Sequence, residues 1–419
     1  MPLVSFILGF YFNENSAGAG GYNGDSSWIR KNIDIFLQNN FRDAILHPDF
    51  FGNRSPLIYI IHKIINPFFG DFEKYRVSGF LFSLLGPIFF YLFLTKKYFE
   101  TDKKILFLIS SILYLSPYYR TSAFWGLNEN YGIVTAILSF LFLYKVKNEN
   151  NNNVLNISLL ILFSSVTVYF DLKLLIIPLI CFFSILNWNL SLKKKIIICL
   201  VYFIFSLPYF YLIFNWGGLV PIATQTVNIK TITSLGDISK IYQIHFGYCA
   251  TLIAFYLLPI ALFVHKNVFN KILEMFKFKF TYFILFLIII YIIYNFYFFD
   301  FKDYTITNHW VGLGVVHKLT NIITSNVFYH EILTYIFFLF SLLLILFYYY
   351  QSKSDILLIS YFFIISLLLW PLMQEYFDPI IFILAFSVFN SIRFFNKINS
   401  LFLLIYFSTF LLIANVYYT

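Results

Sequence analysis

Residues 280–297 read FTYFILFLIIIYIIYNFY and contain no charged side chain. An α-helix rises about 1.5 Å per residue, so a run of this length comes close to crossing the bilayer's hydrocarbon core, which is about 30 Å thick. Lipid offers backbone amides no hydrogen-bond partner, so the run must be helical. The whole chain is 60% hydrophobic and 12% charged. The sequence therefore predicts an all-α polytopic membrane protein without a large soluble domain.

Comparable apolar runs recur along the whole chain. They predict about 13 transmembrane helices in one integral membrane domain, residues 1–419, of which the first is unusually short. Pro178 and Pro371 are expected to kink or end the helices that contain them. The expected spans lie near 2–12, 77–94, 105–117, 130–144, 154–170, 174–187, 195–214, 247–264, 280–297, 332–349, 356–373, 379–392 and 400–418.

The loops between these runs alternate in charge. One set holds 16 Lys and Arg against 5 Asp and Glu, and the alternate set holds 13 against 15. Because Lys and Arg concentrate in cytoplasmic loops, the basic set is expected to face the cytoplasm, with the N-terminus inside. The net charge of +9 is then explained by topology, and no nucleic-acid partner is expected. The basic loops are 95–104, 145–153, 187–195, 265–279, 350–355 and 393–399.

The first outward loop, residues 13–76, is the largest. A glycine-rich stretch leads to Asp25, and apolar residues at Ile29, Ile33 and Phe36 then predict an amphipathic helix along the membrane interface. A second interfacial helix is expected to begin at Ser55-Pro56, with serine as the cap and proline in the first turn. Other outward segments are 117–130, 215–246, 298–331 and 374–378. Two interfacial helices over a bundle suggest a roofed cavity that a lipid-linked substrate enters sideways.

Four segments give the chain a resemblance to a known family. Asp25 follows the first span, and the stretch from His47-Pro48-Asp49 to Ser55-Pro56-Leu57-Ile58-Tyr59 is hydrophobic and contains prolines. The others are Asn215-Trp216-Gly217-Gly218-Leu219-Val220 and Glu375-Tyr376-Phe377-Asp378-Pro379. In layout the chain resembles the GT-C membrane glycosyltransferases, and distantly the dolichyl-phosphate-glucose glucosyltransferases. Two departures are the missing arginine in the late segment and a single acid, not an adjacent pair, in the first loop.

The resemblance implies a bacterial inner-membrane enzyme with its active site outside the cytoplasm. It would transfer a sugar, with inversion, from a polyprenyl-phosphate donor to a lipid-linked or cell-envelope acceptor. No cofactor is expected. His309, His317 and His330 share one loop, but their spacings of 8 and 13 match no zinc pattern. The three cysteines, Cys181, Cys199 and Cys249, show no metal or redox spacing.

The resemblance points to Asp25 as the catalytic base. A carboxylate held under a lipid-facing roof has its pKa raised by burial and becomes a better base for the acceptor hydroxyl. The alternative is that Asp25 only caps a helix that begins at Ser26 or Ser27. Asp49 is the second candidate for the base, and its alternative is an ordinary loop acid after Pro48.

The departing phosphate needs fixed positive charge. The outward cations near span ends are Arg54, Arg120, Lys302, His309 and Lys318. Arg120 is favoured, against the alternative that it anchors a span end at the lipid headgroups; Arg54 either contacts substrate or pairs with Asp49. Glu129 either binds the acceptor or is a solvated acid at a helix start. Glu375 and Tyr376, in the late segment of the resemblance, are further candidate substrate contacts.

Two other classes of protein remain as alternatives. A surface-polysaccharide polymerase of the O-antigen type also has many spans, but is expected to rely on arginine and histidine in two late loops. Here the largest loop is the first and the late loops are poor in arginine. A flippase or transporter is expected to show internal repeats and charges within spans, and the sequence shows neither.

Overall fold

The computed structural model describes residues 1–14, 24–52, 55–148, 154–188, 190–225, 238–264, 268–302, 313–368, 372–392 and 400–412. Within these residues the chain consists of helices and loops, with no strand. It divides into two compact units. Unit 1 comprises Met1–Thr231 and Phe407–Thr419, and unit 2 comprises Ile232–Tyr406. The all-helical fold expected from the sequence is confirmed for the described residues.

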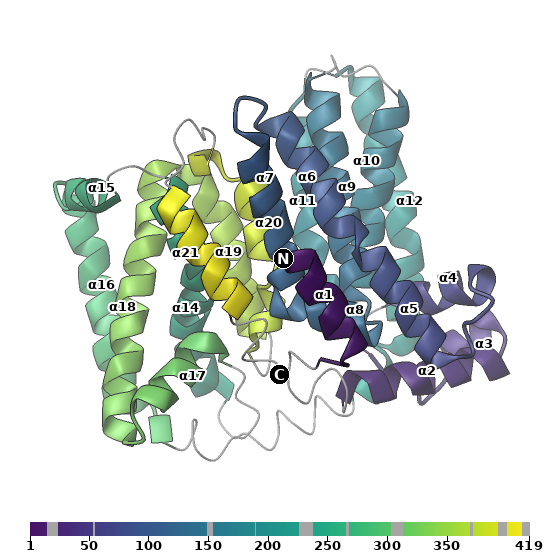
Figure 1. Cartoon of the computed structure of the whole chain (residues 1–419), viewed down its shortest axis with the longest axis horizontal. Helices are drawn as coiled ribbons and strands as arrows, with labels where there is room; N and C mark the ends of the chain where they lie inside the picture. The colour runs from purple at the N-terminus through teal and green to yellow at the C-terminus, as the bar shows by residue number, and fades with distance from the viewer. Residues whose placement is uncertain are drawn as a thin grey trace. The chain divides into compact units, whose positions relative to one another are not determined.

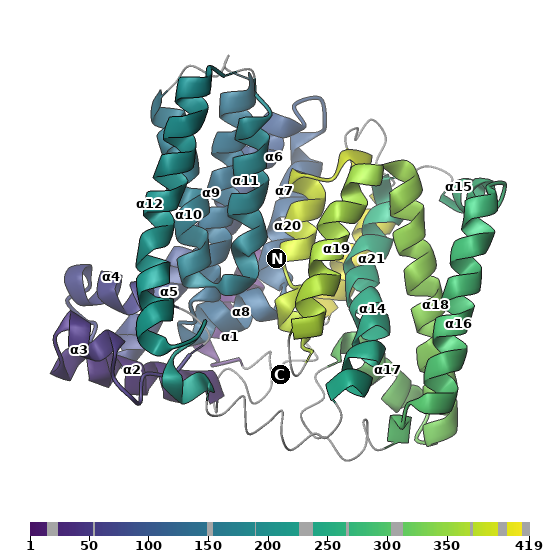
Figure 2. The same cartoon turned by 180° about the vertical axis from the view of Figure 1, so that it is seen from behind.

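In unit 1, long helices run side by side and short ones gather at one end of them (Figures 1 and 2). α2, α3 and α4 form this end, opposite to the C-terminal ends of α6 and α9 and the start of α12. The helices are α1 (Pro2–Tyr11), α2 (Ser26–Gln38), α3 (Phe41–Ile45), α4 (Leu57–Ile65), α5 (Phe72–Ser83), α6 (Leu85–Lys97), α7 (Lys103–Ser111), α8 (Pro117–Trp125), α9 (Glu129–Asn148), α10 (Val154–Phe170), α11 (Ile176–Leu186) and α12 (Leu192–Trp216), with 3-10 turns η2 (Ile112–Leu115) and η3 (Leu172–Leu175).

In unit 2, α14, α16, α18 and α19 run side by side, and α17 lies across one end while α15 lies at the other (Figure 2). The helices are α14 (Ile238–Val264), α15 (Val268–Met275), α16 (Lys279–Phe298), α17 (Gly314–Ile323), α18 (Val327–Gln351), α19 (Lys353–Leu368), α20 (Ile380–Ser387) and α21 (Ser400–Leu412), with 3-10 turns η5 (Gln374–Tyr376) and η6 (Asn390–Ile392). The last helix, α21, crosses the boundary between the units at residue 407.

Five helices in the described part of the chain are long and apolar enough to cross a membrane, or six if a bent pair counts as one span. The chain is thus a helical protein of membrane-spanning character, and the finer count of 13 spans stays a prediction. The five are Phe72–Lys97, Leu192–Trp216, Gln243–Leu262, Lys279–Phe298 and Val327–Gln351. Other expected spans are shorter apolar helices, such as α1 with 10 residues and α20 with 8.

The distribution of large apolar side chains separates two kinds of helix. Only 11% of the most apolar part of α12 and 17% of that of α16 are buried inside the protein. Exposed phenylalanines such as Phe210, Phe214 and Phe286 cover these two helices. α9, in contrast, buries most of its side chains against its neighbours. Exposed apolar faces of this size are what a lipid-contacting helix requires.

The alternation of basic loops is present within unit 1. The C-terminal ends of α6 and α9 and the start of α12 lie together, away from α2, α3 and α4. These ends carry Lys96, Lys97, Lys145, Lys147, Lys193, Lys194 and Lys195. Which side of a membrane this end faces stays a prediction.

The segment expected as an outward loop at 117–130 is instead helical. Ser116 caps α8 by accepting the backbone N–H of Tyr119, and Pro117 occupies the first turn. Gly126 ends α8 in the left-handed conformation, with φ 68°. A Cβ there would lie 2.8 Å from the ring of Tyr75, so only glycine fits. α9 then departs at 118° to α8. The loop expectation failed because a cap, a proline and a glycine make a short helix out of a polar stretch.

Candidate functional site

The first loop region is fixed onto unit 1 by hydrogen bonds from distant parts of the chain. Trp216, at the end of α12, donates its Nε1–H to the carbonyl of Ile45 at 3.1 Å. Thr224 accepts the N–H of Gly52 at 2.9 Å and donates to the carbonyl of the same residue at 3.1 Å. Ser55 donates to the carbonyl of Tyr169 at 2.5 Å. α2, α3 and α4 therefore form a rigid layer at one end of the unit.

α2 and α4 are the two amphipathic helices that the sequence predicts. Ile29, Ile33 and Phe36 of α2 are buried as expected, and Tyr59 of α4 packs on Phe36 with ring centroids 5.4 Å apart. Asn32 stands in this contact, where its Nδ2 donates to the carbonyl of Phe51 at 2.7 Å and to the hydroxyl of Tyr59 at 3.1 Å. The Asn32 side chain therefore links α2 and α4 to the loop between them.

Asp25 directly precedes α2 and already has helical backbone angles, φ −65° and ψ −38°. Its carboxylate makes no capping hydrogen bond to the helix, so the N-cap interpretation finds no support in this geometry. The side chain is half-buried. Asp25 thus lies at the start of α2, but its carboxylate does not cap the helix.

An aromatic residue and a cation follow Asp25 on the same face of α2. Residues three apart on a helix are surface neighbours, which places Trp28 beside Asp25 and Lys31 beside Trp28. Trp28 is 37% exposed and stacks on Phe51, with ring centroids 3.9 Å apart. The Nζ of Lys31 lies 6.0 Å from the Trp28 ring. We call Asp25, Trp28 and Lys31 the α2 strip. The sequence indicates Trp28 as a tryptophan near a membrane interface, with contact to a sugar as the alternative, and it gives no signal for Lys31.

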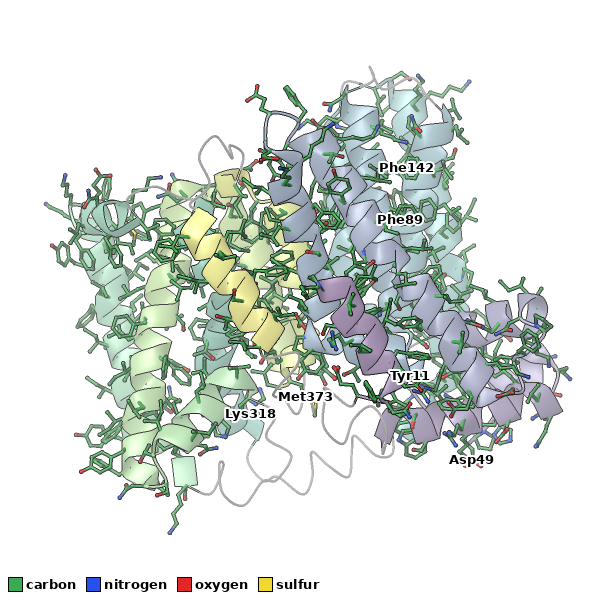
Figure 3. All side chains as sticks on the ribbon, viewed as in Figure 1. Tyr11, Asp49, Phe89, Phe142, Lys318 and Met373 are labelled. Carbon is green, nitrogen blue, oxygen red and sulfur yellow. The ribbon has the colours of Figure 1, made fainter. Side chains whose placement is uncertain are left out.

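Asp49, the second candidate base, belongs to the same surface (Figure 3). Its carboxylate lies 3.4 Å from Nζ of Lys31. Both side chains are about half exposed, so the pair contributes at most about 1 kcal/mol. Asp49 therefore already has a cation beside its carboxylate.

Arg76 of α5 connects this layer to the interior. Its guanidinium donates to the carbonyl of Phe124 at 2.7 Å, to Oε2 of Glu73 at 2.6 Å and to Oδ1 of Asn13 at 2.9 Å. It also lies over the Trp125 ring at 4.0 Å. Glu73 in turn pairs with Arg30 of α2 at 3.5 Å.

Arg120, the cation favoured for phosphate binding, is buried in α8 with 1% of its surface exposed. It donates from Nε to Oε1 of Glu14 at 2.7 Å and from Nη2 to Oε2 of the same carboxylate. Nη1 reaches the hydroxyl of Ser5 at 3.2 Å and the carbonyl of Tyr114 at 3.0 Å. A Cβ on Gly9 would lie 2.5 Å from both charged groups. The guanidinium is thus enclosed by protein groups and is not the exposed loop cation that the sequence suggested.

Glu14 is the functional neighbour that sequence reasoning missed. It follows the short α1, and its backbone carbonyl accepts the indole N–H of Trp125 at 3.0 Å. Glu14 and Arg120 are 106 residues apart in the chain, so no spacing rule could connect them. Glu129, at the start of α9, is half-buried, and its Oε2 lies 3.5 Å from the hydroxyl of Ser122.

The remaining candidates lie in unit 2 or outside the described residues. Glu375 and Tyr376 are half-buried in η5. Gln374 holds this turn, since it accepts the N–H of Val315 and donates to the hydroxyl of Tyr256, each at 2.9 Å. Lys318 projects from α17 (Figure 3) and is exposed, as is Lys302. The candidates Arg54 and His309, and the expected helix breaker Pro371, lie outside the described residues.

No metal site is evident in the parts of the chain that the structure describes, because no group of three His, Cys, Asp or Glu side chains there can hold an ion. The site in unit 1 is thus built from carboxylates, aromatic rings and cations. The chain belongs to the class of helical proteins with membrane-spanning helices. Comparison with known proteins gives no matching family model, no matching curated protein and no matching solved structure.

Proposed function

We propose that the chain is a membrane glycosyltransferase. It transfers a sugar from a polyprenyl-phosphate donor to a lipid-linked or cell-envelope acceptor on the extracytoplasmic side of the bacterial inner membrane. Asp25 is its catalytic base. The observation that carries this proposal is the α2 strip, in which a half-buried carboxylate that does not cap its helix stands beside an exposed tryptophan and a lysine.

The strip offers one group for each demand of the reaction. The Asp25 carboxylate takes the proton of the acceptor hydroxyl. The Trp28 ring, supported from below by Phe51, is a flat apolar surface with a polar edge, suited to packing against a sugar ring. Lys31 supplies positive charge for the departing phosphate. Of the two candidate bases, Asp25 is preferred because it is half-buried, whereas Asp49 is exposed beside Lys31.

The chemical step is a single displacement. The acceptor oxygen, losing its proton to Asp25, attacks the anomeric carbon from the face opposite the phosphate. A new carbon–oxygen bond forms as the bond to the phosphate oxygen breaks, and the phosphate leaves with the electron pair. The product has the inverted anomeric configuration, and the polyprenyl phosphate remains in the membrane.

The rigid layer of α2, α3 and α4 favours such a step. A reacting carboxylate must stay within hydrogen-bonding reach of its substrate, and displacement by 1 Å is costly. The hydrogen bonds of Trp216, Thr224 and Asn32 fix the layer that carries Asp25. The chain of contacts from Arg30 through Glu73 to Arg76 fixes α2 against α5. Asp25 is therefore carried by a helix that is held at several points.

The test compares purified wild type with Asp25→Asn in nanodiscs, supplied with radiolabelled polyprenyl-phosphate sugars and a lipid extract of the source cells. General-base help is typically worth about 100- to 10,000-fold in rate, so Asp25→Asn should lose transfer by that factor. The matched control is Asp34→Asn, the same chemical change at an exposed position of α2, which should retain wild-type rates.

Equal transfer by Asp25→Asn and wild type would remove Asp25 as the base, and Asp49→Asn would be measured next. Absence of transfer by wild type with every donor would contradict the glycosyltransferase proposal as a whole. The assay then moves to polysaccharide polymerisation and lipid-linked sugar export, the two alternatives that the sequence leaves open.

A further inference from the structure

Unit 2 contains two buried histidines in contact at the end that carries α17. His317 of α17 and His330 of α18 have ring centroids 4.9 Å apart and are 6% and 5% exposed. Nδ1 of His317 lies 3.3 Å from the hydroxyl of Tyr248, and its Nε2 lies 3.3 Å from Nδ2 of Asn321. An amide nitrogen only donates, so Nε2 accepts and Nδ1 carries the proton. Both nitrogens of His317 are therefore occupied.

His330 is different. Its Nε2 is buried and has no hydrogen-bond partner among the residues that the structure describes. The ring packs edge-on against Phe301, with centroids 5.1 Å apart. A buried polar atom without a partner bears the full cost of leaving water, so such an atom in a native protein needs an explanation. A ligand that supplies the missing hydrogen bond is one.

The charges around His330 select the kind of ligand. Burial, followed by the proximity of His330 and Lys318, lowers the pKa of His317 to about 4, so this ring is neutral at physiological pH. Asp300 and Glu331 directly adjoin Phe301 and His330 in the chain. A neutral imidazole with two acids and one cation, Lys318, in its neighbourhood is a poor site for a phosphate, because like charges repel. A neutral imidazole nitrogen suits a hydroxyl group, which both donates and accepts.

We propose that unit 2 binds a sugar ring at His330, whose Nε2 hydrogen-bonds to a sugar hydroxyl while Phe301 packs against the apolar face of the ring. The choice of a sugar among neutral alcohols rests on the proposed function. The site itself rests on His317, His330, Tyr248 and Phe301, all within unit 2.

The test is nuclear magnetic resonance of the full chain in detergent, with histidine labelled by carbon-13 at Cε1. His317→Phe and His330→Phe assign the two signals. The probes are the methyl α-glycosides of glucose, galactose and mannose, N-acetylglucosamine and inorganic phosphate. One of the sugars should shift the His330 signal saturably and the His317 signal with it.

His245 is the internal control. It is a fully buried histidine of the same unit whose Nδ1 lies 3.3 Å from the Ser366 carbonyl, and its signal should stay unchanged.

Replacing His330 with phenylalanine keeps the ring and removes the nitrogen, so the sugar that binds wild type should bind this variant about tenfold more weakly. Binding to this variant is followed through the His317 signal.

No shift with any sugar would overturn the proposal and leave ordered water as the partner of Nε2. A shift with phosphate alone, or equal affinity for His330→Phe, would overturn it as well. Sugar binding is measured here without sugar transfer. A negative binding result therefore leaves the Asp25 test intact, and a negative transfer result leaves the binding test intact.

Discussion

Unit 1 and unit 2 handle buried polarity in different ways. Unit 1 buries full charges and pairs them. Arg120 pairs with the buried Glu14, and the buried Arg76 pairs with the exposed Glu73. The α17 end of unit 2 buries neutral rings, His317, His330 and Tyr248, and leaves one nitrogen without a partner among the described residues. Taking an ion out of water costs several kcal/mol, which only a close partner offsets.

The difference indicates different tasks. A saturated ion pair has no capacity left for a ligand, so the buried arginine of α8 serves the architecture, and the proposed substrate contacts in unit 1 are those of the α2 strip. A neutral histidine with a nitrogen that has no described partner stabilises the fold less than a buried ion pair does, and this nitrogen can still bind a ligand. Breaking the pair of Arg120 and Glu14 should lower the stability of the fold, and removing the His330 nitrogen should weaken ligand binding.

The largest expected effect comes from Arg120→Met. The variant leaves the Glu14 carboxylate buried without its partner, which typically costs about 3–5 kcal/mol. Unfolding by sodium dodecyl sulfate, followed by circular dichroism, measures the loss. Wild-type stability of this variant would contradict the assignment of an architectural role.

The matched double variant, Glu14→Gln with Arg120→Met, separates the pair from the packing around it. A neutral glutamine needs less solvation than a carboxylate, so the double variant should regain a large part of the stability. If the losses of the two single variants simply add, the two side chains do not act as a pair.

Acid is the next test, because the described residues include one buried neutral histidine of each unit, His62 and His317, in helices outside the expected spans. Burial lowers the pKa of His62 and of His317 from 6.5 to about 4. The unfolded chain therefore takes up protons first as the pH falls. The contribution of each of these two histidines to the free energy of unfolding is complete above pH 6.5, declines toward pH 4 by up to about 1.4 kcal/mol per pH unit, and then levels off.

Replacement by glutamine distinguishes the contributions of the units. Denaturant titrations between pH 7.5 and 4.5 should show a shallower decline for His62→Gln and for His317→Gln, since neither amide titrates. An unchanged slope in one variant would mean that the histidine of that unit is accessible to protons in the folded state.

The smallest effect on stability is expected for His330→Phe. The change removes a buried nitrogen that lacks a described partner and keeps the ring against Phe301, so the free energy of unfolding should change by less than about 1 kcal/mol or rise. Thermal unfolding in detergent checks this. A loss as large as that of Arg120→Met would mean that the nitrogen is engaged within the fold, and the contrast between the units would disappear.

Hydropathy predicted the long helices well, for a physical reason. Apolar runs such as 195–214 and 280–297 must be helical, because in lipid their backbone can form hydrogen bonds only within the segment, and this requirement acts locally. The periodic residues Ile29, Ile33 and Phe36 likewise predicted the buried face of α2. Span lengths were less secure, because protein neighbours can bury an apolar helix as well as lipid can, as in the short α20.

The site was predictable only in part. Asp25 was singled out as a candidate from its place after the first apolar run. Its position at the start of α2 was expected, but the absence of a capping hydrogen bond was not. The pair of Glu14 with Arg120, and that of Lys31 with Asp49, depend on which distant segments fold together. Single-sequence patterns carry no such information, so Arg120 looked like an exposed cation and Glu14 attracted no notice.

The 106 residues between Glu14 and Arg120 also set an order of events during synthesis. At 5–20 residues per second, Glu14 is made roughly 5–20 seconds before the arginine that neutralises it. The short α1 cannot settle with its buried carboxylate until α8 has been translated. A segment made earlier is in this sense assembled only together with one made later.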